Sequence, residues 1–146
     1  MTAPSSPPAA SSPALPVAIL VVDDEEAIRS ALKRFLLGQG YEVVTAATGA
    51  EAVQAVQRHK LACVLLDVRL PDASGVDLVR WIRSYEQGQE RFTVVIALTR
   101  APEEYPVDMA RAVGFDAYFT RPPTTDDLTV ALAALMSAHR TRRSAA

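Results

Sequence analysis

The stretch VLLDVRLPD, residues 64–72, decides the fold and points to a site. An apolar run from Leu61 to Leu66 ends abruptly at Asp67, and Pro71 follows four residues later. A run that is apolar on both faces is typical of a strand inside a parallel sheet covered by helices. The run therefore predicts a core strand with a carboxylate at its carboxyl end. The groups that interact with this carboxylate must come from other parts of the chain.

Strand patterns recur along the chain on either side of this run. Four further strands are expected at residues 17–22 (VAILVV), 41–46 (YEVVTA), 92–99 (FTVVIALT) and 116–120 (DAYFT). Between them, apolar residues recur at the three- and four-residue spacing of helices. Five strands that alternate with five helices predict an α/β sandwich built on a parallel sheet.

Helix start signals support this alternation. The first helix follows Asp24, and Thr48 with Glu51 forms a capping-box pattern at the start of the second. The remaining helices are expected to begin at Ser74, at Pro106 and at Thr124. The predicted order is therefore strand and then helix, five times over.

The two ends of the chain differ in composition from its centre. Residues 1–16 carry no charged side chain, and their Pro, Ala and Ser content predicts a disordered tail. Residues 139–146, HRTRRSAA, are interpreted as a basic C-terminal tail after the last helix. One domain is expected over residues 17–138, and the tail is too short for a DNA-binding module.

The composition of the 146 residues excludes several classes of protein. Apolar residues make up 49% and charged residues 22%, which is ordinary for a globular domain, and the net charge of −2 creates no field that attracts DNA or a membrane surface. A run of 18 apolar residues is absent from the sequence, so no membrane span is expected. The single cysteine, Cys63, cannot form an internal disulfide and fits a reducing, cytoplasmic compartment.

Polar residues follow the apolar strands at the point where each strand ends. Asp23 and Asp24 close the first strand, Asp67 the third and Thr99 the fourth, and Arg121 lies just past the fifth. The carboxyl ends of parallel strands share one edge of the sheet, so these side chains should gather there. Clustered carboxylates repel each other and recruit a cation, and oxygen ligands favour Mg²⁺ or Mn²⁺. A hydroxyl and a guanidinium beside that ion suit a phosphoryl group.

Four motifs make the sequence recognisable. They are VVDDEE (21–26), LLDVRLPDASG (65–75), VVIALT (94–99) and GFDAYFTRP (114–122). In this order and spacing, the chain from about Val17 to Ala138 resembles the receiver domain of two-component response regulators. The resemblance implies a flavodoxin-like (βα)5 three-layer sandwich with strand order 2-1-3-4-5, and a signalling protein, not an enzyme.

The resemblance also implies a role for each acidic residue of the predicted edge. Asp67 would be the phosphoacceptor, a nucleophile toward the phosphohistidine of a histidine kinase or phosphotransfer protein. Asp24 would bind Mg²⁺ directly and Asp23 through water. The backbone carbonyl of Arg69 would supply a further Mg²⁺ ligand.

The remaining implied roles concern the phosphorylated state. Thr99 would hydrogen-bond a phosphoryl oxygen, Tyr118 would be the switch aromatic, and Pro122 is a candidate for a cis peptide bond. A downstream protein target would bind the face of the last helix, strand and helix, with Met109 and Leu128 expected at its edges. Met109 considered alone is predicted to be a core residue.

The chain departs from the family pattern at two cationic positions. The family has lysine where Arg121 stands, and a planar guanidinium does not substitute conservatively for a compact ammonium. The family also prefers a small residue after the threonine, and here Arg100 occupies that place. We expect Arg100, with Arg69, to tune the lifetime of a phosphorylated state.

Three other functions compete with this interpretation. A phosphatase of the haloacid dehalogenase type would need a second aspartate where Arg69 stands. A flavin or nucleotide binder would need glycines or hydroxyls in the loop after the first strand, where DDEE repels phosphate. The strongest competitor is a pseudo-receiver, a protein-docking module that is never phosphorylated and in which Arg100 or Arg121 replaces the cation.

Overall fold

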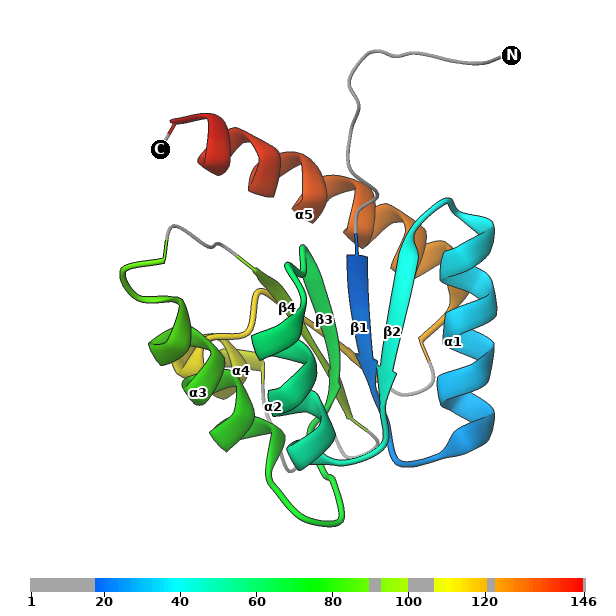
Figure 1. Cartoon of the computed structure of the whole chain (residues 1–146). Helices are drawn as coiled ribbons and strands as arrows, with labels where there is room; N and C mark the ends of the chain where they lie inside the picture. The colour runs from blue at the N-terminus through cyan, green and yellow to red at the C-terminus, as the bar shows by residue number, and fades with distance from the viewer. Residues whose placement is uncertain (1–17, 90–92, 100–106, 121–122, 146) are drawn as a thin grey trace, which may run out of the picture.

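The computed structural model describes residues 18–89, 93–99, 107–120 and 123–145, in which strands and helices alternate (Figure 1). The strands are β1 (Ala18–Val22), β2 (Glu42–Ala46), β3 (Cys63–Asp67), β4 (Val94–Thr99) and β5 (Ala117–Thr120). The helices are α1 (Glu26–Gly38), α2 (Gly49–Arg58), α3 (Gly75–Glu86), α4 (Val107–Val113) and α5 (Thr125–Ala145).

The five strands form one parallel sheet in the order β2-β1-β3-β4-β5, which confirms the predicted class and strand order. The register aligns the carboxyl ends of the inner strands: Val22 pairs with Leu66, and Asp67 pairs with Leu98. All residues of β1, β3 and β4 are buried. The apolar run that ends at Asp67 is therefore the middle strand of the sheet.

Helices cover both faces of the sheet and complete the three layers (Figure 1). Successive strand residues point to opposite faces, so Leu20 and Ile19 belong to different cores. One core joins the sheet to α2, α3 and α4, and the other joins it to α1 and α5. Each predicted amphipathic helix thus buries its apolar stripe against one side of a doubly covered sheet.

The helix start signals read from the sequence are present. The hydroxyl of Thr48 accepts a hydrogen bond from the Glu51 amide at 3.2 Å, and a Glu51 carboxylate oxygen accepts one from the Ala47 amide at 2.8 Å. The hydroxyl of Ser74 accepts from the Val76 amide at 3.1 Å. These bonds satisfy amides that have no partner inside the helix and fix where α2 and α3 begin.

Several boundaries differ from the sequence prediction. β3 begins at Cys63 and not at Leu61, and α5 runs to Ala145, so residues 139–145 have helical backbone and do not follow the last helix. Val17 and Pro106 lie outside the described residues. Within the described part of the chain, none of the helices combines the length and apolarity of a membrane-spanning segment.

Two side chains lie where the sequence prediction did not put them. Met109 is 48% exposed on α4, so its assignment to the core is wrong. Leu128, expected at the edge of a surface, is 1% exposed and packs from α5 into the core against the sheet. Helical spacing alone could not decide which side of these helices meets the sheet.

A charged network joins the end of α3 to the amino ends of β4 and β5. The Arg83 guanidinium donates two hydrogen bonds to the Gly114 carbonyl, at 3.0 and 2.7 Å, and one to the Thr93 carbonyl at 2.6 Å. It also pairs with Glu86 at 3.1 Å and with Asp116 at 2.8 Å. One side chain therefore holds three segments together at the end of the sheet opposite the acidic edge.

Candidate functional site

Three carboxylates lie together at the carboxyl edge of the sheet. Asp23 follows β1, Asp24 comes next in the same loop, and Asp67 is the last residue of β3. One carboxylate oxygen from each lies within 4.8 Å of the other two. Asp23 and Asp67 are buried, with exposed fractions of 0% and 3%, while Asp24 is exposed. The cluster therefore consists of two buried carboxylates and one that faces solvent.

Backbone amides set the orientation of the two buried carboxylates. Oδ1 of Asp23 accepts a hydrogen bond from the Glu25 amide at 2.9 Å, and Oδ1 of Asp67 accepts one from the Arg69 amide at 3.0 Å. Both are bonds to the residue two positions later, in the manner of an Asx turn. The same local device thus fixes both side chains, and it can form because each strand ends at or just before its aspartate.

The cluster suits a small divalent cation. Its ligand atoms are all oxygens, which Mg²⁺ prefers. Two ligands about 2.1 Å from one ion lie at most about 4.2 Å apart, so a spacing of up to 4.8 Å needs a small closure or one ligand acting through water. The residues present therefore fit Mg²⁺, and they could hold it without rearrangement of the sheet.

The segment after Asp67 folds into a tight hairpin. The Gly75 amide donates to the Val68 carbonyl at 2.7 Å, and the Leu70 amide donates to the Ala73 carbonyl at 3.1 Å. A side chain at Gly75 would put its Cβ 2.7 Å from the Val68 Cα and 2.8 Å from the Asp67 carbonyl oxygen. Glycine is required there because the backbone passes directly beside the strand end that carries Asp67.

Thr99 and Tyr118 lie on the neighbouring strands. Asp67 pairs with Leu98 on β4, so Thr99 is one residue beyond that partner, at the same edge, and only 5% exposed. Tyr118 lies on β5, where it pairs with Ala97 of β4, and it packs against the core that includes α4. Its hydroxyl oxygen is buried, so the ring points into the protein in this structure.

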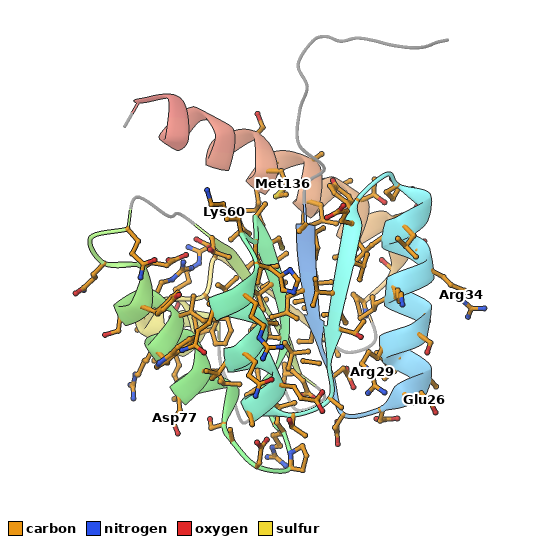
Figure 2. The ribbon with its side chains drawn as sticks, in the orientation of Figure 1. Glu26, Arg29, Arg34, Lys60, Asp77 and Met136 are labelled. Atoms are coloured by element: carbon orange, nitrogen blue, oxygen red, sulfur yellow. The ribbon has the colours of Figure 1, made fainter. Side chains whose placement is uncertain are left out.

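The cationic residues named from the sequence are distributed differently. The Arg69 side chain is exposed, while its backbone lies in the hairpin after Asp67. Arg100, Arg121 and Pro122 lie outside the described residues. A further cation, Arg29, was missed by the sequence prediction: Nη1 donates to the Asp23 carbonyl oxygen at 2.8 Å from the first turns of α1 (Figure 2).

Comparison with known proteins identifies the family. The family model described as the response regulator receiver domain matches residues 19–133. The chain therefore belongs to the receiver-domain family of two-component systems, and its fold and acidic edge are those of that family. Receiver domains are signalling domains that bind Mg²⁺ at an acidic pocket and interact with histidine kinases or phosphotransfer proteins.

Curated relatives and solved structures agree with this assignment. The chain is 37% identical over 128 residues to the transcriptional regulatory protein KdpE of Mycobacterium tuberculosis, covering 88% of this chain and 53% of KdpE. It is 34% identical to PdtaR of the same organism, covering 87% and 60% respectively. The chain thus spans about half the length of the curated relatives it matches.

Two solved structures have the same fold. The CheY-like receiver domain of Methanospirillum hungatei is similar at a TM-score of 0.79 with 27% identity, covering 87% of this chain and 98% of that one. The chemotaxis response regulator CheY4 of Vibrio cholerae is similar at a TM-score of 0.73 with 30% identity, covering 83% and 99%. Both comparisons cover nearly the whole of the solved chain, so the likeness extends over a complete domain.

Sequence reasoning did not single out Asp72, which the structure gives a defined place. Its carboxylate accepts hydrogen bonds from the Gly49 amide at 2.7 Å and the Ala50 amide at 3.1 Å, at the start of α2. These two bonds hold the pKa of Asp72 below its ordinary value. The pair Pro71-Asp72 marks a turn in the sequence, but the partner 22 residues away is visible only in the fold.

Proposed function

We propose that this protein is a working receiver, in which Asp67 accepts a phosphoryl group from the phosphohistidine of a histidine kinase or phosphotransfer protein. The observation that carries the proposal is the acidic edge. A buried carboxylate at the end of the central strand lies beside two others, in a chain of the receiver family. The acidic edge supplies the nucleophile and the candidate metal ligands, and the family membership supplies the class of reaction that the proposal assigns to them.

In the proposed reaction, a carboxylate oxygen of Asp67 attacks the phosphorus atom. The new phosphorus–oxygen bond forms as the phosphorus–nitrogen bond to the partner's histidine breaks, and the bonding electron pair leaves with the imidazole. The amide of Arg69, bound to Oδ1, holds the carboxylate in one orientation. Burial of Asp67 limits access of water, which slows hydrolysis of the acyl phosphate.

Mg²⁺ would be held by Asp23, Asp24, Asp67 and the backbone carbonyl of Arg69. When bound, it neutralises charge on the transferred group. The spacing of the carboxylates favours coordination of one of them through water, and Asp23 is the candidate because the family pattern gives this role to its position. Asp24, the exposed member, can adjust most easily to bind the ion directly.

Thr99, Arg121 and Tyr118 would respond to the phosphoryl group. Thr99 lies one position past the partner of Asp67, within reach of a group attached there, and can donate its hydroxyl hydrogen. Arg121 would supply positive charge to the phosphoryl oxygens. The Tyr118 ring, whose hydroxyl is already buried, would be stabilised in this inward position when Thr99 moves toward the phosphoryl group.

The output would be docking of a downstream protein on the face formed by α4, β5 and α5. Two exposed apolar side chains support this choice: Met109 on α4 is 48% exposed and Val130 on α5 is 70% exposed. Tyr118 on β5 connects that face to the acidic edge through its contacts with the core. No nucleic-acid partner is part of the proposal.

Intact mass after incubation with acetyl phosphate and Mg²⁺ tests the proposal. The parent protein should gain one phosphoryl group, which hydroxylamine removes because an acyl phosphate is labile. Asp67→Asn should gain none, and Asp77→Asn, an exposed carboxylate on α3, is the matched control that should behave as the parent does. A gain that persists in Asp67→Asn would place the modified residue elsewhere.

A pseudo-receiver remains the second candidate because of Arg100 and Arg121, which replace a small residue and a lysine in the family pattern. If Arg100 shields the phosphoryl group from water, Arg100→Ala should load phosphate normally and lose it faster. If Arg100 instead pairs with the acidic cluster and locks it, Arg100→Ala should bind Mg²⁺ and load more readily than the parent. Loading and decay rates of this one variant separate the two ideas, and unchanged rates would contradict both.

A further inference from the structure

The hairpin after Asp67 is held at both ends. At its base, Gly75 packs against Val68, and the Gly75 amide bonds the Val68 carbonyl at 2.7 Å. At its tip, the Asp72 carboxylate accepts hydrogen bonds from amides at the start of α2. Arg69, whose carbonyl is the proposed metal ligand, lies between the two ends and pairs with Ser74 across the hairpin.

The contact at the tip is built from more than one interaction. Each oxygen of the Asp72 carboxylate accepts a hydrogen bond from a different amide, Oδ1 from Gly49 and Oδ2 from Ala50. Both amides belong to the first turn of α2, where helix amides lack partners and the helix dipole favours a negative charge. A Cβ at Gly49 would lie 2.7 Å from the Ala73 Cβ, so glycine permits this close approach.

We propose that Asp72 is a positioning residue for the metal site: by fixing the hairpin tip to α2, it holds the Arg69 carbonyl in place to bind Mg²⁺. The inference rests on the metal site proposed above. It has a consequence for α2, because a coupling between two sites is reciprocal. If the bond from Asp72 to α2 favours the metal-binding form of the hairpin, Mg²⁺ favours the attachment of Asp72 to α2.

The first measurement is Mg²⁺ affinity, followed through the NMR amide signals of Asp67 and Arg69. Groups that orient metal ligands typically change affinity by about tenfold to a hundredfold when removed. Asp72 lies three positions from Arg69 and acts on its carbonyl only through the hairpin backbone, so Asp72→Ala should weaken Mg²⁺ binding by about threefold to tenfold. Asp72→Asn keeps one acceptor oxygen and should recover part of the loss.

Two controls separate positioning from simple stability or charge. Thr48→Ala removes the other side-chain cap of α2 but leaves Asp72 in place, and its Mg²⁺ affinity should stay within about twofold of the parent. Asp77→Asn removes one exposed negative charge at the start of α3, and its affinity should also be unchanged. If Thr48→Ala weakens Mg²⁺ binding as much as Asp72→Ala does, the effect belongs to the stability of α2 and the inference is wrong.

The second measurement is hydrogen exchange at the Gly49 and Ala50 amides. Saturating Mg²⁺ should slow their exchange in the parent protein and leave it unchanged in Asp72→Ala, because the link to the metal site is then cut. Parent-like Mg²⁺ affinity in both Asp72 variants would overturn the inference and leave the proposed function intact. Absence of any Mg²⁺ response in the parent would overturn the proposed metal site, and this inference with it.

Discussion

Replacing Arg83 with alanine should lower the free energy of unfolding far more than a surface arginine ordinarily does. The guanidinium makes hydrogen bonds to two backbone carbonyls and two carboxylates, although the side chain is 30% exposed. Bonds to a charged group contribute about 1.5 to 3 kcal/mol each when water is excluded, and exposure together with non-additivity reduces their sum. We expect a loss of about 2 to 4 kcal/mol for Arg83→Ala.

The reason is what the substitution leaves behind. Glu86 is 8% exposed and would keep the Thr93 amide on Oε2 but lose the cation on Oε1. Asp116 would keep the Val95 amide and lose its ion pair. A carboxylate buried without its cation is costly, so Glu86 accounts for much of the expected loss.

Urea unfolding followed by the fluorescence of Trp81 measures this change. The matched control is Arg80→Ala, an exposed arginine one turn earlier on α3, which should change stability by less than about 0.5 kcal/mol. The double variant Arg83→Ala/Glu86→Gln should lose less than the two single changes together, because the unpaired charge is gone. A loss for Arg83→Ala no larger than that of the Arg80 control would refute the reasoning.

Three further predictions follow from the packing and the charges. Gly75→Ala should destabilise the protein by about 2 kcal/mol or more, because the new alanine Cβ would meet backbone atoms that cannot move aside. Gly38→Ala has open space around it and should not destabilise the protein, and urea unfolding compares the two variants. Because the pKa of Asp72 is lowered on folding, its contribution to stability is complete above the ordinary pKa of 3.8 and is lost as the pH falls below that value. The difference in free energy of unfolding between the parent and Asp72→Asn should therefore shrink in an acid unfolding series, and a constant difference would contradict this. Cys63 is buried, and burial raises the pKa of its thiol. A thiol reagent should therefore label the native protein at pH 8 only as fast as the protein unfolds, and labelling at the rate of a free thiol would show that Cys63 is accessible.

Local patterns in the sequence were sufficient for the class of fold and for the edge where the site lies. Strands that are apolar on both faces can be stable only inside a sheet with two covers, and the carboxyl ends of parallel strands must share an edge. For this reason, the residues alone predict that Asp23, Asp24 and Asp67 lie together, and the fold brings their oxygens within 4.8 Å. The helix starts at Thr48 and Ser74 were also predictable, because capping depends on residues close in sequence.

Tertiary structure alone decided the exposure of Met109 and Leu128 and which distant groups meet. Met109 and Leu128 both have helical spacing, and only the angle at which α4 and α5 lie against the sheet exposes one and buries the other. The bonds from Arg83 to Asp116 and from Asp72 to α2 join residues 33 and 22 or 23 positions apart. A sequence specifies such contacts only through the complete packing of the chain, so the acidic edge was predictable from the residues and its supporting bonds were not.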